Sequence, residues 1–164
     1  MIVFQPLSES HNTSGFACGT KPFDDYIQQQ AIYEQSRGIT RTFVAIEDTS
    51  DSPVALGYFT LKATDKTFTP EPGGLRELLH PVELVYLARD LTWRKTGMGA
   101  GLLIEALRLS VEASERIGLP GIYLRSTSQG ARLYESFGFT RVDGGSFYMP
   151  MHRAKGLIEK GDSQ

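Results

Sequence analysis

The sequence predicts a single α/β domain built around a mixed sheet of parallel and antiparallel strands. One observation is that short runs rich in β-branched and aromatic residues alternate with stretches of helical period. Another is that the middle of the chain has the order strand, helix, strand, helix, which can join parallel strands. The third is a length of 164 residues with no internal repeat and no linker. We therefore expect one domain over residues 1–154 and a polar tail over 155–164.

The first third of the chain is predicted to hold a strand, a helix and a hairpin. Residues 2–7 are an apolar-rich strand, and Thr20 is suited to cap a helix that runs to about residue 35. The β-rich runs at 41–47 and 54–62 are separated by a turn-forming stretch of Asp, Ser and Pro. That arrangement favours a hairpin.

The middle of the chain contains the strongest helix, predicted at residues 97–117. It follows a loop at 69–74, a short apolar piece at 75–79 and a strand at 81–89. One side of the helix carries acidic and basic residues, so the other side is expected to face the core. The residues expected on that buried side are Leu103, Leu107, Val111 and Ala113.

The last part of the chain is predicted to form a strand, a helix and a hairpin. Residues 121–125 are a brief strand, and Ser126-x-x-Gln129 has the form of a capping box that starts a helix ending at Phe137. The runs at 139–142 and 147–152 then flank a glycine-rich turn. From Lys155 onward the chain is polar, and we expect it to fray.

The composition excludes several classes of protein. Hydrophobic residues make up 40% of the chain, and the net charge of −2 gives no global field that attracts nucleic acid or acidic lipid. Cys18 is the only cysteine, which excludes an internal disulfide and a cysteine-based zinc cluster. His11, His80 and His152 lack metal-ligand spacing, so we expect surface histidines and no metal.

The chain is expected to work in the cytoplasm. Its first residues lack the basic and long apolar regions of a signal peptide. No apolar run approaches the length that spans a bilayer, so we expect no membrane partner.

Residues 94–99 read Arg-Lys-Thr-Gly-Met-Gly, an R-x-x-G-x-G run that we call the glycine loop. It lies between a strand and the long helix. Glycines let the backbone approach a ligand closely, and the first turn of a helix presents unpaired N–H groups to an anion. Arg94 and Lys95 add positive charge. The loop therefore has the makings of a diphosphate site, and the alternative is a helix entry that only needs glycine.

A second motif follows about 35 residues later, where the chain reads Leu133-Tyr134-x-x-Phe137-Gly138-Phe139. Together with the strand at Leu87-Ala88-Arg89 and the glycine loop, it resembles the GNAT acetyltransferase superfamily. The resemblance covers essentially the whole chain. It implies a mostly antiparallel, twisted sheet flanked by helices and splayed between its central strands. It also implies acetyl-coenzyme A as the acetyl donor and direct attack by a primary amine.

The resemblance assigns roles to particular residues. The glycine loop would hold the diphosphate of acetyl-coenzyme A, the strand before it would bind the pantetheine arm, and Tyr134 would protonate the departing thiolate. Considered alone, Tyr134 is better explained as a core aromatic packed at the spacing of Leu133 and Phe137, whereas within the two motifs the role of acid is favoured. The expected cofactor-binding residues are Leu87, Ala88, Arg89, Arg94, Lys95, Thr96, Gly97, Met98, Gly99, Ala100 and Ser128.

A general base is needed because the attacking amine must lose its proton. Glu83 is the best carboxylate candidate, since it lies early in the strand that leads to the acetyl site. An exposed charge at the start of a strand is the alternative interpretation of Glu83. Asp90 with a water chain is another candidate for the base.

The amino-terminal third narrows the branch of the superfamily. Phe16-Ala-Cys18-Gly19, Phe23-Asp-Asp-Tyr26 and Arg41-Thr-Phe-Val44 resemble the tRNA-acetylating toxins of toxin–antitoxin pairs. Those enzymes acetylate the α-amine of aminoacyl-tRNA and are neutralised by a DNA-binding antitoxin protein. Cys18 is read here as a small buried residue and not as a nucleophile.

Three functions remain open at this stage. A pI near 5.9 does not favour a tRNA-binding surface, so an unidentified primary amine is ranked first and charged tRNA second. The third is a catalytically silent module that binds coenzyme A or a partner protein. A homodimer, as in many relatives, would fit a sheet edge near the last strand.

Overall fold

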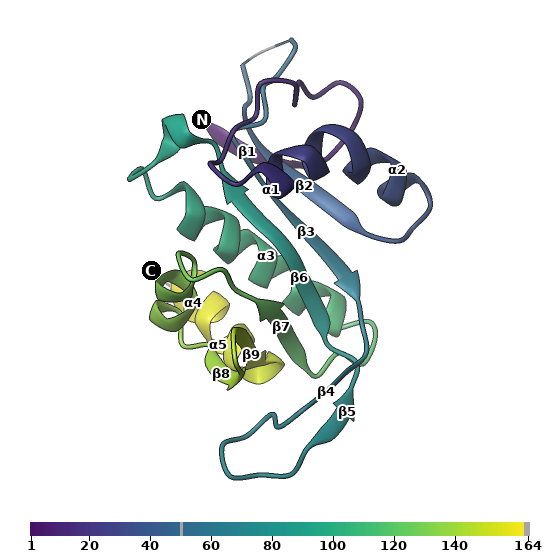
Figure 1. Cartoon of the computed structure of the whole chain (residues 1–164), viewed down its shortest axis with the longest axis vertical. Helices are drawn as coiled ribbons and strands as arrows, with labels where there is room; N and C mark the ends of the chain where they lie inside the picture. Colours follow the sequence, from purple (N-terminus) through teal and green to yellow (C-terminus); the bar gives the residue numbers. More distant parts are fainter. Residues whose placement is uncertain (50, 163–164) are drawn as a thin grey trace. The chain divides into compact units, whose positions relative to one another are not determined.

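The computed structural model describes residues 1–49 and 51–162 and contains a seven-stranded sheet with the order β1-β2-β3-β6-β7-β9-β8 (Figure 1). The pairs β1–β2, β2–β3, β7–β9 and β8–β9 are antiparallel, and β6–β7 is parallel. This confirms the predicted mixed, mostly antiparallel sheet. In sheet order the strands are β1 (Ile2–Pro6), β2 (Arg41–Glu47), β3 (Gly57–Ala63), β6 (Val82–Arg89), β7 (Gly121–Arg125), β9 (Ser146–Pro150) and β8 (Thr140–Asp143).

A second, two-stranded sheet and the helices complete the fold. Its strands are β4 (Lys66–Phe68) and β5 (Glu77–Leu79), joined by the long loop that Figure 1 shows in teal. The helical segments are α1 (Lys21–Asp25), the π-helical η1 (Tyr26–Gln30), α2 (Ala31–Ser36), the 3-10 turn η2 (Leu91–Trp93), α3 (Met98–Ser114), α4 (Ala131–Ser136) and α5 (Met151–Asp162).

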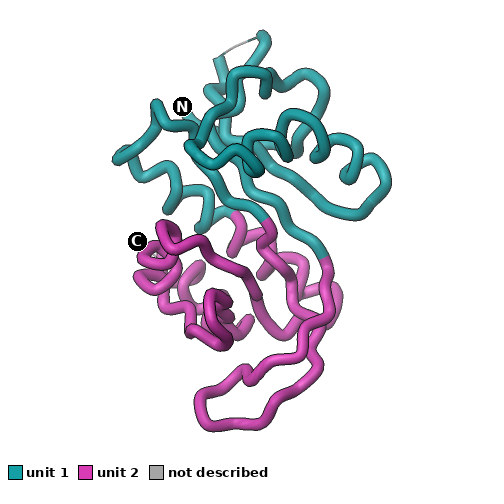
Figure 2. The backbone as a smooth tube through the Cα atoms, viewed as in Figure 1, with its two compact units in different colours: residues 1–62, 86–105 teal, residues 63–85, 106–164 magenta. Residues whose placement is uncertain are grey.

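The chain divides into two compact units (Figure 2). Unit 1 comprises Met1–Lys62 and Tyr86–Glu105, and unit 2 comprises Ala63–Val85 and the chain from Ala106 onward. Strand β6 and helix α3 each contribute residues to both units.

In unit 1, aromatic rings form much of the core. The rings of Tyr26 and Tyr86 stack with centroids 4.0 Å apart, and Phe16 packs edge-on against Tyr58. The Tyr58 hydroxyl donates to the Phe23 carbonyl, which ties the helical segment to β3. Offset and edge-on aromatic pairs add to the free energy gained by burying the rings.

Gly57 explains how the start of α3 approaches β3. A Cβ atom at this position would lie 2.8 Å from Leu102 Cδ1 and 3.2 Å from the Ala88 carbonyl oxygen. A larger residue would push the helix away from the sheet. The close contact holds the first turns of α3, and with them the end of the glycine loop.

In unit 2, α5 packs against β7 and β9, with Ala154 fully buried. Arg108 of α3 donates to both carboxylate oxygens of Asp162 at 3.1 Å. The prediction that the tail frays from Lys155 onward is therefore wrong for residues 155–162. A helix formed by tertiary contacts carries little local signal, because packing rather than propensity supplies most helical stability.

Three further predictions need correction. The Ser126-x-x-Gln129 segment is not a capping box: α4 begins at Ala131, and the Ser126 hydroxyl donates to the Thr127 carbonyl. Ala113 is exposed, unlike the three residues predicted to share its side of the helix. Strand β4 falls in a stretch for which the sequence predicted no element.

His11 is also not the surface residue that we predicted, since only 7% of it is exposed. Its Nδ1 accepts a hydrogen bond from the Ser8 N–H, and its Nε2 lies 3.0 Å from Gln5 Oε1. Burial lowers the pKa of His11 below its ordinary value of 6.5. The folded chain therefore holds this imidazole in its neutral form.

This burial predicts a loss of stability in acid. As the pH falls below about 6.5, the unfolded state binds a proton on His11 and the folded state does not. The free energy of unfolding then decreases until the pH reaches the lowered folded pKa, where the decrease stops. We expect the His11→Gln variant to lack this component in urea titrations across the pH range. If the free energy of unfolding of the variant fell with pH as steeply as that of the wild type, His11 would not be the source of the acid sensitivity.

No helix within the described part of the chain is long and apolar enough to cross a membrane.

Candidate functional site

The glycine loop follows a capped 3-10 turn in unit 1. Asp90 caps this turn: its Oδ1 accepts from the Thr92 N–H at 3.0 Å, and its Oδ2 accepts from the Ala17 N–H at 3.1 Å. Burial raises the pKa of the Asp90 carboxyl, but hydrogen bonds from Thr92 and Ala17 outweigh it and leave the pKa below its ordinary value. Asp90 therefore serves as an ionised cap that positions the loop after it.

Two residues of the loop adopt a left-handed backbone. Gly97 has φ +84°, and Lys95 has φ 60°, a conformation that costs a non-glycine residue about 1 kcal/mol. The Thr96 hydroxyl oxygen accepts from the Met98 N–H, which shapes the entry into α3. Such a backbone conformation is typical of loops that hold a ligand.

The surface of the loop suits a diphosphate. Arg94 and Lys95 are exposed, and the Arg94 Nε donates to the Leu91 carbonyl. A Cβ atom at Gly97 would meet nothing within 4 Å. The N–H groups of Gly99 and Ala100 lie in the first turn of α3, where a helix offers them no acceptor. Unpaired backbone donors, open space beside Gly97 and two exposed cations therefore lie within one short segment.

The strand before the loop is only partly paired with its parallel neighbour. Register between β6 and β7 runs from Val82↔Ile122 to Leu84↔Leu124, while β6 continues to Arg89. This is the splay expected between the central strands. Leu87 and Arg89 are half-buried, whereas Ala88 is buried in the core of unit 1.

Tyr134 lies in unit 2, on α4, and 7% of it is exposed. Its ring packs edge-on against Phe139, with centroids 5.7 Å apart, and at 6.1 Å from Phe147. Burial raises the pKa of Tyr134 to about 12. Within residues 1–49 and 51–162 its hydroxyl makes no hydrogen bond, so it is a protonated donor without an acceptor.

Glu83 is buried in unit 2 and is not an exposed charge at the start of a strand. Its Oε1 lies 3.6 Å from Lys66 Nζ, an ion pair too long for a strong hydrogen bond. Among the side chains that the structure describes, none donates a hydrogen bond to this oxygen. Lys66 also lies 5.4 Å from the centroid of the Tyr123 ring. A buried carboxylate oxygen with a cation nearby is free to accept a proton.

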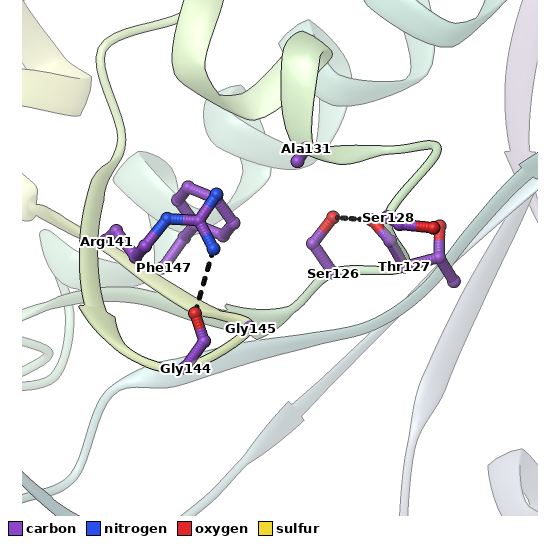
Figure 3. A pocket seen from close by; sticks show the side chains of 8 residues that line it. All are labelled: Ser126, Thr127, Ser128, Ala131, Arg141, Gly144, Gly145 and Phe147. Carbon is purple, nitrogen blue, oxygen red and sulfur yellow. Dashed lines mark hydrogen bonds between the residues drawn. The ribbon is translucent and has the colours of Figure 1, made fainter.

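Ser128 lines a pocket in unit 2 between the β7–α4 loop and the β8–β9 turn (Figure 3). Its volume is about 350 Å³, and we call it the serine pocket. The Ser126 N–H donates to the Gly145 carbonyl at 2.8 Å and joins the two walls. The lining residues are Ser126, Thr127, Ser128, Ala131, Arg141, Gly144, Gly145 and Phe147.

The structure thus groups the predicted residues within each unit. The glycine loop and Leu87–Arg89 belong to unit 1, whereas Glu83, Ser128 and Tyr134 belong to unit 2. Sequence reasoning did not single out Arg141 or Ser126 as site residues. The glycine-rich turn at 143–145 lies near Arg141 in the sequence, and Ser126 was predicted only as a helix cap.

Cys18 is half-buried, and burial raises the pKa of its thiol to about 11. A thiol in this state is a poor nucleophile, because the thiolate is the reactive form. This agrees with the expectation that transfer does not pass through a cysteine.

Comparison with known proteins gives one sequence relative of clear interest. A tRNA-acetylating toxin of Mycobacterium tuberculosis (strain ATCC 25618 / H37Rv) is 28% identical over 132 residues, which span 78% of this chain and 77% of the toxin. No protein-family model matches the chain.

Solved structures of similar fold cover nearly the whole chain. A tyrosine-to-phenylalanine mutant of the KacT toxin has a TM-score of 0.86 at 20% identity and covers 95% of this chain and 98% of its own. AtaT complexed with acetyl-methionyl-tRNAfMet has a TM-score of 0.85 at 19% identity, covering 96% and 99%. AtaTR bound with acetyl-CoA has a TM-score of 0.82 at 21% identity, covering 96% and 98%. The chain therefore shares the fold of these proteins and is similar in sequence to a tRNA-acetylating toxin, and the resemblance of its two motifs to the GNAT superfamily agrees with both.

Proposed function

We propose that the chain transfers the acetyl group of acetyl-CoA to the α-amine of an aminoacyl-tRNA. The observation that carries this proposal is the likeness to a tRNA-acetylating toxin over 78% of the chain. Because of this likeness we rank charged tRNA ahead of an unidentified primary amine. The net charge alone had favoured the opposite order. The pI near 5.9 describes the whole chain and does not exclude a local basic surface.

The residues of unit 1 fit the diphosphate of acetyl-CoA. Positive φ at Gly97 and open space beside it let the backbone come close to the ligand. One side of the diphosphate would be lined by Arg94, Lys95 and Thr96. The other side would be bound by the backbone N–H groups of Gly97, Met98, Gly99 and Ala100. The backbone of Leu87–Arg89 would bind the pantetheine arm. The assignment of Ser128 to the cofactor stays a prediction.

Acetyl-CoA supplies an activated acetyl group: a bond forms between the amine nitrogen and the thioester carbon while the carbon–sulfur bond breaks, leaving N-acetyl product and coenzyme A. Tyr134 is the acid in this proposal, and it gives its hydroxyl proton to the departing sulfur. A pKa of about 12 keeps that proton in place throughout the physiological range. The free hydroxyl has no competing acceptor among the described residues.

Glu83 is the base in this proposal. Its free, buried oxygen can take the proton that the attacking amine must lose. The Lys66 ammonium lies 3.6 Å from this oxygen and is its nearest described cation partner. Only a moderately strong base is needed to take this proton, because an α-amine has a pKa of about 8 and is partly neutral near pH 7.

We expect Glu83→Gln to lower kcat by about 10²-fold at neutral pH, the lower end for general acid–base catalysis. The deficit should grow as the pH falls, because more of the amine then carries the proton that the base must remove. Glu115→Gln, an exposed carboxylate in the same unit, is the matched control and should leave kcat unchanged. A Glu83→Gln variant with the wild-type pH profile would exclude Glu83 as the base.

The same proposal includes a protein partner and a place of action. A related structure is a mutant AtaT toxin bound to the C-terminus of the antitoxin AtaR, so we propose that an antitoxin binds and inhibits this chain. Charged tRNA is a cytoplasmic substrate, and we propose the cytoplasm as the location. A homodimer stays a prediction.

A cell-free translation reaction tests the function as a whole. Acetylation removes the nucleophilic amine that forms the peptide bond, so translation should stop when the chain is added with acetyl-CoA. Without acetyl-CoA, or with Tyr134→Phe, translation should continue. Inhibition that needs no acetyl-CoA, or no inhibition at all, would count against the toxin function.

A further inference from the structure

The serine pocket has the size of a site for one small group. Its volume of about 350 Å³ falls at the small end of ligand pockets, which begin at about 300 Å³. The Ser126–Gly145 hydrogen bond holds its two walls together. A single nucleoside fits this space, whereas a duplex does not.

Arg141 is one of the residues that line this pocket, and its guanidinium is planar. Its guanidinium carbon lies 4.7 Å from the centroid of the Phe147 ring, and that ring is fully buried. One terminal nitrogen donates to the Gly144 carbonyl at 2.8 Å and the other to Glu135 Oε1 at 2.9 Å. With its edge occupied and one face on Phe147, the guanidinium offers its second face to a ligand.

That face suits a base better than a phosphate. Glu135 already balances the charge of Arg141, which weakens its attraction for a free anion. Stacking of a base on a guanidinium plane is a common way to recognise single-stranded RNA. Figure 3 shows the hydroxyl-bearing residues Ser126–Ser128 across the pocket from Arg141, where they can bond the polar edge of a stacked base.

The pocket also lies next to Tyr134. A Cβ atom at Gly130 would lie 3.2 Å from Ser126 Oγ, 3.4 Å from Thr127 Oγ1 and 3.4 Å from Tyr134 Cε2. Only this glycine separates the pocket hydroxyls from the ring of the proposed acid. A group bound in the pocket is therefore held beside Tyr134.

We infer that the serine pocket binds the terminal adenosine of the acceptor RNA, with its base stacked on Arg141. The inference rests on the proposed function. In charged tRNA the amino acid is esterified to the ribose of that adenosine, so a nucleoside fixed here carries the reactive α-amine to Tyr134. Acetyl-CoA also contains an adenosine, and the experiment distinguishes the two sources.

The variants Arg141→Met and Arg141→Lys test the stacking surface. Both variants remove the planar guanidinium group, but Arg141→Lys keeps its positive charge. We expect both to raise KM for charged tRNA by about 5- to 150-fold, the range for one stacked base, with no change in the Kd of acetyl-CoA. Arg132→Met changes an exposed arginine of helix α4, in the same unit as Arg141 and outside the pocket, and is the control. Weaker binding of acetyl-CoA in these variants would assign the pocket to the cofactor. A wild-type KM for charged tRNA in Arg141→Lys would mean that positive charge, and not the plane, is what matters. Either result overturns the inference.

Because Arg141 also braces the β8–β9 turn, a second experiment uses the unaltered chain. The acceptors are 3′-deoxy-3′-(methionylamino)adenosine and methionine amide, which share the amine and differ by the nucleoside. We expect kcat/KM to be about 5- to 150-fold higher with the nucleoside. Equal values, with charged tRNA still acetylated, would overturn the pocket and spare the proposed function. If charged tRNA is not acetylated while simple amines are, the proposed function fails and the inference fails with it.

Discussion

Replacing Tyr134 with phenylalanine is expected to lower kcat by about 10²- to 10⁴-fold, the contribution of a general acid. The ring packs against Phe139 and Phe147, and phenylalanine keeps these contacts. The hydroxyl has no hydrogen-bond partner in the described part of the chain, so its removal should leave stability nearly unchanged. The Kd of acetyl-CoA, measured by calorimetry, should stay the same while single-turnover rates fall.

Tyr148 provides a matched control for this substitution. It is buried in the same unit, and burial raises its pKa to about 12 as well. Tyr148→Phe should therefore keep the wild-type rate. A Tyr134→Phe variant as active as Tyr148→Phe would return Tyr134 to a packing role.

The raised pKa of Tyr134 also predicts the form of the pH profile. An acid must be protonated, so its contribution is lost only as the pH rises through its pKa. With a pKa of about 12, Tyr134 should cause no loss of kcat between about pH 7 and 10. A basic limb in this range that disappears in Tyr134→Phe would contradict the assigned environment.

Replacing Gly97 is expected to weaken acetyl-CoA binding by about 10- to 150-fold, the loss of one hydrogen bond to a charged group. Asparagine is the informative substitution, because it tolerates the left-handed backbone at φ +84° yet places a side chain in the open space beside the loop. Calorimetry measures the Kd, and thermal melting reports any cost in stability.

Gly15→Asn is the control for this change. Gly15 belongs to the same unit, has open space around a Cβ atom and lacks a positive φ. It should bind acetyl-CoA like the wild type. An unchanged Kd in Gly97→Asn would exclude close approach of the ligand at Gly97. Weak binding in Gly97→Ala alone would mean that the glycine matters only for its backbone conformation.

Local patterns predicted the strands that lie inside the sheet. The β-rich runs at Arg41–Glu47 and Gly121–Arg125 were predicted with the bounds observed. Features that depend on distant partners were not predicted. Helix α5 owes its order to β7, β9 and the Arg108–Asp162 ion pair, and His11 is buried by contacts with Gln5 and Ser8.

The candidate site divides in the same way. The glycine loop and Tyr134 belong to contiguous motifs, so the sequence could nominate them, and their roles remain predictions. The free oxygen of Glu83 depends on Lys66, which lies on a strand that no pattern indicated. Arg141 gains its stacked face only from Phe147 and Glu135, contacts that a linear motif does not express.

The most direct test of the account is mass spectrometry of acetyl transfer from labelled acetyl-CoA to purified charged tRNAs, beside polyamines, free amino acids and peptides. We expect labelled N-acetyl-aminoacyl-tRNA, formed by the wild type and greatly reduced with Tyr134→Phe. Label confined to the small amines or peptides would contradict it, as would coenzyme A binding with no acetylated product.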